Sequence, residues 1–223
     1  MKLISGLLDE RIAIMEGKIG DFPADLFPDE EAFISTAVER RRREFTAGRA
    51  CARHAMLQLG IAAVSLPPQE DRVPKWPGEL VGSITHDETH VAAAVARRSD
   101  GFRSVGIDVE PYKPLPWDLW ESILRPHELS KIEKQNSLDP GIRARAIFCA
   151  KECAFKCQYG VTRAMIEFHD LEIELDESNL SFKARLMIDA ESFPPNEIPV
   201  GRLRINKNFI SAAMSIGSIK PGA

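Results

Sequence analysis

One short segment, residues 104–110, constrains both the fold and the chemistry of this chain. It reads Ser-Val-Gly-Ile-Asp-Val-Glu, which is typical of a β-strand with alternating aliphatic and acidic side chains. Because neighbouring side chains on a strand point to opposite faces, we expect Ile107 and Val109 to face the core and Asp108 and Glu110 to share the other face. Crowded carboxylates favour a cation between them, and Mg²⁺ suits hard oxygen ligands. On this segment alone, a solvent-facing edge with ordinary charged residues stays open.

The composition indicates an ordinary soluble globular protein. The chain has 223 residues and is 44% hydrophobic, which is enough to bury a sizeable core. No apolar run approaches the roughly 20 residues of a membrane span. Acidic residues 9 and 10 interrupt the apolar N-terminal stretch, which makes it a poor signal peptide, so we expect a cytoplasmic protein without a membrane partner. A net charge of −4 argues against a nucleic-acid partner.

A local cluster of arginines departs from this acidic balance. Six arginines lie between residues 40 and 53, and Arg49 and Arg53 are spaced to share one helix face. Two guanidinium groups one turn apart can hold a phosphate, and Lys75 could add to them. The alternative is a solvated helix face.

Two further groups of residues could carry chemistry. Glu152 and Lys156 are spaced i, i+4, which permits either a simple helical ion pair or a metal ligand beside a phosphate-binding cation. The run Gly82-Ser83-Ile84-Thr85-His86 ends a predicted strand and presents hydroxyls and an imidazole to an anion. The cysteines at 149, 153 and 157 are too far apart along a helix to share one metal, so we interpret them as packing residues.

The order of elements predicts an α+β fold with two similar, pseudo-symmetric lobes, each made of helices packed on a small antiparallel sheet. Proline-rich residues 111–116 place the boundary between lobes 1–113 and 114–223. The first lobe has a predicted helix from 29 to 59 and a three-stranded meander at 81–85, 91–97 and 104–110. The second has predicted helices at 117–134 and 143–158 and strands at 171–175, 182–188, 202–206 and 209–215.

The motifs together are more specific than any one of them. In order, the chain carries Arg-Arg-Glu-Phe-Thr-Ala-Gly-Arg at 42–49, Lys-Trp-Pro at 75–77, Gly-Ser-Ile-Thr-His at 82–86, Gly-Ile-Asp-Val-Glu at 106–110 and Lys-Glu…Lys at 151–156. This series resembles the 4′-phosphopantetheinyl transferase superfamily, in particular its Sfp-type, enterobactin-synthase-like branch. Asp87 and Glu88 depart from that branch, which usually has Cys or Ser and then Gly after the histidine.

The resemblance implies a monomeric enzyme with its active site in the cleft between the lobes. It implies transfer of the phosphopantetheine arm of coenzyme A to a serine of an apo acyl or peptidyl carrier protein, with Mg²⁺ (or Mn²⁺) and release of adenosine 3′,5′-bisphosphate. Asp108, Glu110 and Glu152 would hold the metal, with Glu152 also as base and Lys156 as the phosphate-stabilising cation. The implied coenzyme A contacts are Arg49, Arg53, Lys75, Ser83, Thr85, His86 and Lys156.

Two alternatives belong to other classes of function. A Mg²⁺-dependent nuclease or nucleotide phosphohydrolase could use the same carboxylates, although such enzymes commonly have Glu-x-Lys rather than Glu-x-x-x-Lys. A non-catalytic module could bind coenzyme A or a carrier without turnover. Retention of Asp108, Glu110, Glu152 and Lys156 argues against that second alternative.

Overall fold

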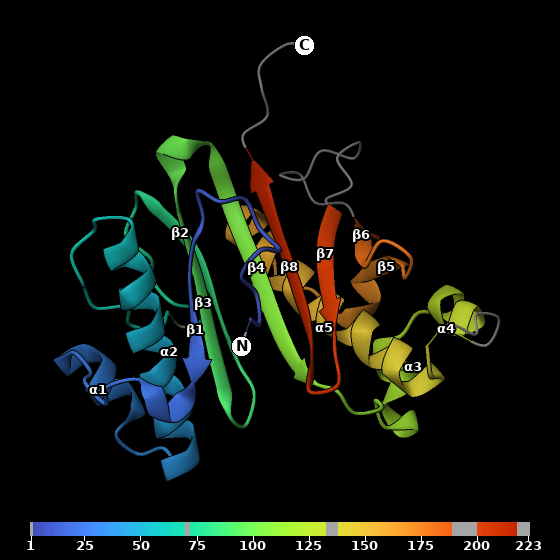
Figure 1. Cartoon of the computed structure of the whole chain (residues 1–223), viewed down its shortest axis with the longest axis horizontal. Helices are drawn as coiled ribbons and strands as arrows, with labels where there is room; N and C mark the ends of the chain where they lie inside the picture. Colours follow the sequence, from blue (N-terminus) through green and yellow to red (C-terminus); the bar gives the residue numbers. More distant parts are fainter. Residues whose placement is uncertain (1, 70–71, 133–137, 189–199, 218–223) are drawn as a thin grey trace.

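Two antiparallel sheets, each packed against one long helix, lie side by side in the computed structural model of the chain (Figure 1). The structure describes residues 2–69, 72–132, 138–188 and 200–217. One sheet has the order β1-β3-β2, with β1 at Ala13–Lys18, β3 at His90–Arg97 and β2 at Leu80–His86. The other has the order β4-β8-β7-β6-β5: β4 Phe102–Pro111, β8 Phe209–Gly217, β7 Val200–Ile205, β6 Ser181–Leu186 and β5 Leu171–Asp176. This confirms the predicted α+β fold with two lobes.

The two long helices each cover one sheet. Helix α2 (Glu39–Gln58) packs small and apolar side chains such as Cys51 and Met56 against the three-stranded sheet. Helix α5 (Pro140–Thr162) packs on β4 and β8 and runs behind them in Figure 1. Shorter helices are α1 (Pro28–Ile34), α3 (Trp120–Ile123) and α4 (Pro126–Ile132). No described helix is long and apolar enough to cross a membrane.

Helix α5 approaches β4 so closely that a glycine is required. A Cβ atom on Gly106 would lie 2.2 Å from the backbone oxygen of Cys153. The thiol of Cys153 in turn donates to the carbonyl of Gly106. All three cysteines of α5 are buried in the same core, which confirms their interpretation as packing residues.

A separate core joins the two sheets on the opposite face. Ile107 and Val109 lie in it, as the alternation on β4 predicts. The N-terminal residues Leu3 and Ile4 complete this core, and Arg204 of β7 donates to three carbonyl oxygens of that segment. Residues 2–5 are therefore part of the fold.

The single predicted helix over 29–59 is wrong. Helix α1 ends at Ile34 and helix α2 begins at Glu39, and Glu30 of α1 pairs with Arg53 of α2. Gly48 lies inside α2 and does not interrupt it. The predicted helix 117–134 is divided before Pro126, because proline disfavours helical geometry in the residue before it. Its predicted end at Lys134 lies outside the described residues.

The predicted three-stranded meander is also wrong. Strand β4 pairs along its length with β8, about a hundred residues away in the chain, and β1 provides the third strand of the first sheet. The remaining predicted strands are confirmed to within a few residues. The boundary at residue 113 stays a prediction, although the change of sheet comes earlier, between β3 and β4.

Candidate active site

Asp108 lies at the centre of the site, at the junction of the two sheets. It is 4% exposed, and its Oδ1 atom accepts from Thr85 Oγ1 at 3.0 Å and from Lys156 Nζ at 2.6 Å. Its Oδ2 atom is buried without a hydrogen-bond partner. A buried carboxylate oxygen left unpaired is costly unless something positive completes it, so Oδ2 is a candidate position for a cation.

Lys156 and Glu152 come to Asp108 from helix α5. Lys156 Nζ also approaches the carbonyl of Ile107 at 3.3 Å. Burial by itself lowers the pKa of Lys156, but the charges of Asp108 and Glu152 outweigh it and raise the pKa. Lys156 is therefore a firmly protonated cation beside the orphaned oxygen.

Burial raises the pKa of Glu152, and the charge of Asp108 raises it further, while Lys156 opposes both. This interaction shows that Glu152 faces the same group of charges. A carboxylate with a raised pKa is a better proton acceptor than an ordinary surface glutamate. The arrangement thus offers a base, a cation and a metal-ligand position close together.

Glu110 follows Asp108 on the same face of β4. Its Oε2 atom accepts from Arg145 Nη1 at 2.9 Å. Burial, helped by the charge of Asp108, raises the pKa of Glu110 to about 7, against the opposing effect of Arg145. The predicted sharing of one face by Asp108 and Glu110 is confirmed, because the intervening aliphatic residues lie in the core on the other side.

These carboxylates fit a divalent cation. The fit rests on the unpartnered Oδ2 atom of Asp108 and on the hard oxygen chemistry of Asp108, Glu110 and Glu152. Within the described ranges, no three acidic, histidine or cysteine side chains are already grouped closely enough to form a complete metal centre. The assignment of the three as ligands stays a prediction.

Ser83 and Thr85 of β2 hold the two sheets together. Ser83 Oγ accepts from the Ile107 backbone N–H, and Thr85 Oγ1 accepts from the Val109 N–H, each at 3.2 Å. Both side chains are buried. The structure thus places them between the lobes, where Thr85 orients Asp108, and their predicted contact with coenzyme A stays a prediction.

His86 stands at the end of β2 among charges from α2. Its Nε2 atom is 3.5 Å from Arg41 Nη1, and its Nδ1 atom is 3.9 Å from Glu44 Oε2. Burial, opposed by Glu44 and helped by Arg41, lowers the pKa of His86. Arg41 is exposed and His86 is half-buried, and both side chains can donate hydrogen bonds to an anion.

The two unexpected acids after His86 have local structural roles. Asp87 Oδ1 accepts from the backbone N–H groups of Thr89 and His90 and so closes the β2–β3 turn. Glu88 lies 3.7 Å from the guanidinium of Arg40. Neither contact blocks the imidazole of His86.

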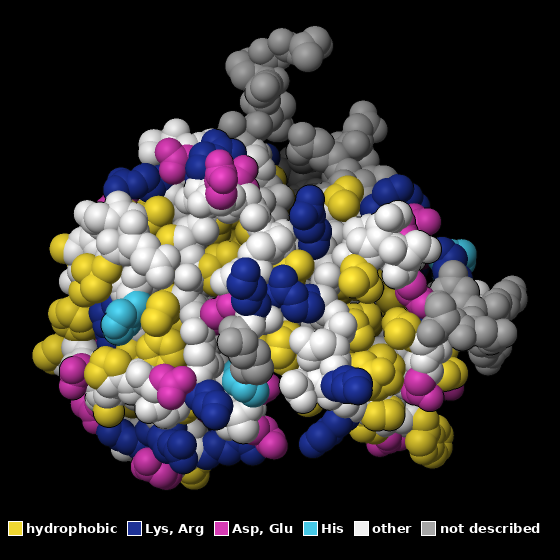
Figure 2. Space-filling model, in the orientation of Figure 1, with side chains coloured by type: hydrophobic (Ala, Val, Ile, Leu, Met, Phe, Trp, Pro, Cys, Tyr) yellow, Lys and Arg dark blue, Asp and Glu magenta, His cyan; other side chains and the backbone are white. Residues whose placement is uncertain are grey.

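Lys75 lines a pocket between the lobes. Lys156 lines the same pocket from α5, and Trp76 and Tyr159 form part of its walls. Two more cationic side chains, those of Arg98 and Arg163, also line this pocket. Helix α5 runs behind β4 in Figure 1, so the Lys and Arg side chains near the middle of Figure 2, which has the same orientation, lie on the face opposite this helix. The pocket therefore suits an anion that extends from Lys156.

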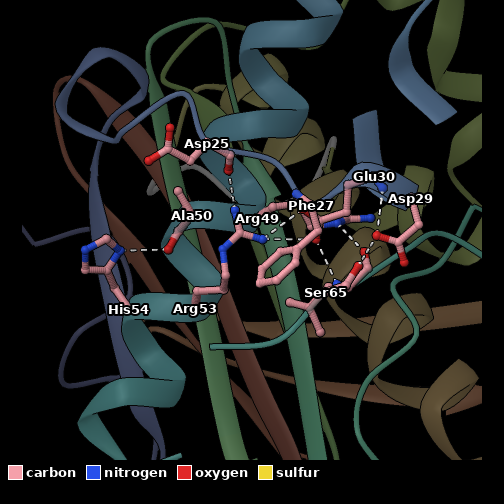
Figure 3. Close-up of polar contacts among 10 residues, drawn as sticks. Asp25, Phe27, Asp29, Glu30, Arg49, Ala50, Arg53, His54 and Ser65 are labelled. Carbon is pink, nitrogen blue, oxygen red and sulfur yellow. Dashed lines mark hydrogen bonds and ion pairs between the residues drawn. The ribbon is translucent and has the colours of Figure 1, made fainter. Parts of the chain in front are cut away.

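Arg49 and Arg53 do not present a joint phosphate site at the surface. Arg53 donates through Nη1 to both carboxylate oxygens of Glu30 and through Nη2 to the carbonyl of Asp25 (Figure 3). Arg49 Nε donates to the carbonyl of Leu66. The two arginines are only 5% and 7% exposed, because they fasten the segments around α2. Their contact with coenzyme A stays a prediction, and neither side chain is accessible in this structure.

Sequence reasoning missed Arg41 and Arg145. Arg41 was hidden in a run of four arginines, whose orientations depend on the helix that carries them. Arg145 had a usable pattern, since it precedes Glu152 by seven residues and Lys156 by eleven, which places all three on one helix face.

Comparison with known proteins identifies the family of this chain. The model of the 4′-phosphopantetheinyl transferase N-terminal domain matches residues 29–96, and that of the 4′-phosphopantetheinyl transferase superfamily matches residues 104–199. The chain therefore belongs to the 4′-phosphopantetheinyl transferase superfamily, and it is an enzyme of that transferase class.

Three relatives are similar to this chain, and two of them carry the same description. The chain is 36% identical to 4′-phosphopantetheinyl transferase Svp of Streptomyces mobaraensis, over 79% of this chain and 73% of Svp. It is 35% identical to 4′-phosphopantetheinyl transferase Npt of Nocardia iowensis, over 77% of this chain and 80% of Npt. Enterobactin synthase component D of Salmonella typhi is 31% identical over 62% of this chain and 60% of that protein.

Proposed function

We propose that the protein moves the phosphopantetheine arm of coenzyme A to a serine of an apo acyl or peptidyl carrier protein and releases adenosine 3′,5′-bisphosphate. The observation that carries the proposal is that Lys156 of α5 binds Oδ1 of Asp108 on β4, while Glu152 of α5 interacts with the charges of both. Phosphoryl transfer depends mainly on positioning and charge stabilisation, and these residue types supply both.

Each residue has a role in this proposal. Asp108, Glu110 and Glu152 hold Mg²⁺ or Mn²⁺, which when bound neutralises pyrophosphate charge. Glu152 accepts the proton of the carrier serine as its oxygen attacks phosphorus. Lys156 stabilises the charge that develops on the phosphate. Thr85 keeps Asp108 oriented through its hydrogen bond to Oδ1.

In this proposal coenzyme A, which donates the phosphopantetheine arm, lies across the junction of the two lobes. The pocket with Lys75 and Lys156 accepts its nucleotide end, and His86 adds an anion contact from β2. A second pocket, lined by Glu152, Phe155, Ile166 and Phe168, offers apolar surface directly beside the proposed base. We propose that the enzyme acts as a cytoplasmic monomer on carriers of siderophore, polyketide or nonribosomal-peptide synthesis.

Mass spectrometry of a carrier tests the proposal directly. Purified protein, coenzyme A and Mg²⁺ are mixed with a panel of apo carrier domains, with Glu152→Ala as the parallel variant. The expected result is a Mg²⁺-dependent gain of one phosphopantetheine by a carrier, lost in Glu152→Ala. Coenzyme A binding without transfer to any carrier supports the non-catalytic module. Absence of both, with hydrolysis of DNA or nucleotides, supports the phosphohydrolase.

A further inference from the structure

Arg145 links a proposed metal ligand to the chain that leaves the active-site strand. Its Nη1 atom donates to Glu110 Oε2 at 2.9 Å. Its Nε and Nη2 atoms each lie 3.3 Å from a backbone oxygen, those of Lys113 and Pro114. One guanidinium group therefore ties together β4, the segment after it and helix α5.

The surroundings hold this side chain in place. Arg145 is 15% exposed and Glu110 is 19% exposed at their side chains, so the ion pair is largely removed from solvent. The guanidinium also lies 5.8 Å from the ring centre of Phe148. An arginine with several directional contacts loses less freedom per hydrogen bond than a lysine, which makes it suited to fixing a carboxylate.

The contact leaves one oxygen of Glu110 available. Arg145 engages Oε2, and the described residues give Oε1 no hydrogen bond. Asp108 shows the same division, with Oδ1 held by Thr85 and Lys156 and Oδ2 unpartnered. One oxygen of each of these carboxylates on β4 is thus held by hydrogen bonds, and the other has no hydrogen-bond partner among the described residues.

We propose that Arg145 is a positioning residue, which orients Glu110 for cation binding by holding Oε2 and the backbone of residues 113 and 114. The inference rests on the proposed function, since it assigns Glu110 to the metal. Partners of metal-ligating carboxylates commonly matter nearly as much as the ligands, and their loss costs about 10- to 100-fold in metal affinity.

Mn²⁺ binding, followed by the electron paramagnetic resonance of free Mn²⁺, tests this without turnover. The full chain is compared with Arg145→Met, Arg145→Lys and Asp108→Ala. Arg204→Met is the matched control, because Arg204 also donates to three backbone oxygens but lies at the N-terminal segment. Circular dichroism and thermal melting without metal establish that each variant is folded.

We expect Arg145→Met to weaken Mn²⁺ binding by about 10- to 100-fold, Arg145→Lys to weaken it less, and Arg204→Met to leave it unchanged. The apparent activation constant for Mg²⁺ should rise in the same order, with little change in the KM for coenzyme A.

Three outcomes would contradict the inference in different ways. Unchanged or tighter Mn²⁺ binding by Arg145→Met, with binding lost in Asp108→Ala, overturns the role of Arg145 alone and leaves the metal site standing. A lower melting temperature with unchanged Mn²⁺ affinity assigns Arg145 to the fold only. No Asp108-dependent binding in the unaltered protein overturns the proposed metal site together with this inference.

Discussion

The two lobes contain the same buried ion pair, built in the same way, yet only one of them stands next to the proposed chemistry. In the first lobe, Glu30 follows Pro28 at the start of α1 and accepts from Arg53 of α2. In the second lobe, Glu128 follows Pro126 at the start of α4 and pairs with Lys151 of α5 at 2.9 Å.

The agreement extends to the backbone. One oxygen of each glutamate accepts from the N–H of the residue before the proline, Phe27 or Arg125. The other oxygen accepts from a distant N–H, that of Leu66 or Ile173, in both cases at 2.7 Å. The two lobes thus repeat a structural unit that is not visible as a sequence repeat.

The difference lies in the residue that follows the cation. Lys151 donates to the carbonyls of Ile123, Phe168 and Leu171, and the next residue, Glu152, faces the charges of the site. After Arg53 comes His54, whose ring contacts the carbonyl of Ala50 within α2 (Figure 3). The buried ion pair fixes a long helix in each lobe. The residue after the cation differs, and only Glu152 faces the proposed site.

Replacing Glu152 or His54, the residues that follow the two buried cations, with alanine should give the largest difference in activity between the lobes. Glu152→Ala should lower kcat/KM by about 10²- to 10⁴-fold, the usual contribution of a positioned base. His54→Ala should leave turnover near that of the unaltered protein, because the ring of His54 contacts the carbonyl of Ala50 and the ring of Phe22 rather than the residues of the proposed site. Steady-state transfer to an apo carrier measures both. A Glu152→Ala enzyme with ordinary activity would remove the functional difference between the lobes.

Breaking either ion pair should affect stability next most. Arg53→Met and Lys151→Met each leave a buried carboxylate without its cation, so each should lower the free energy of unfolding by about 3–5 kcal/mol. Urea denaturation measures this, and replacing both partners, as in Glu128→Leu with Lys151→Met, should recover part of the loss. If Arg53→Met keeps its stability but loses coenzyme A affinity, Arg53 is a ligand-binding residue and the lobes are not equivalent.

A smaller effect on activity is expected from replacing Lys75, which lines the proposed coenzyme A pocket between the lobes. Lys75→Ala should raise the KM for coenzyme A by roughly 10-fold and leave kcat unchanged, since a hydrogen bond to a charged group contributes about 1.5–3 kcal/mol. Lys183→Ala, an exposed lysine of β6, is the control. If Lys75 contacts the 3′-phosphate, its effect should vanish with dephospho-coenzyme A; the same loss with both donors would place Lys75 elsewhere on the ligand.

The smallest predicted effect is a pH dependence of stability from Glu110. Its pKa, raised by burial and by Asp108 to about 7, means that the folded state binds a proton more tightly than the unfolded state. The stability of the metal-free protein relative to Glu110→Gln should therefore fall as pH rises from about 4.5 to 7, by at most about 1.4 kcal/mol per pH unit.

Thermal or urea denaturation in a chelator across this range measures the dependence. Comparison with Glu110→Gln cancels the opposite contribution of His86, whose lowered pKa favours stability as pH rises toward 6.5. A difference that stays flat with pH would mean that Glu110 is as well solvated as an ordinary glutamate.

Because local backbone geometry is regular, the sequence alone indicated which candidate site residues lie near one another. A strand alternates its side chains, so Asp108 and Glu110 had to share one face, opposite the aliphatic residues between them. A helix repeats every 3.6 residues, so Glu152 and Lys156 had to lie near each other. The order of the predicted elements indicated the α+β class and the two lobes, and the resemblance of the motif series indicated the family.

Tertiary structure alone decided the long-range relations. The pairing of β4 with β8 depends on residues about a hundred positions apart, and no local pattern distinguishes it from the expected meander. The burial of Arg53 depends on Glu30 in another helix, so spacing alone could not show that its guanidinium group binds a carboxylate inside the protein. Arg145 likewise gained its place only when α5 docked against β4 and brought it to Glu110. Sequence spacing fixes which side chains share a face, whereas packing fixes what that face meets.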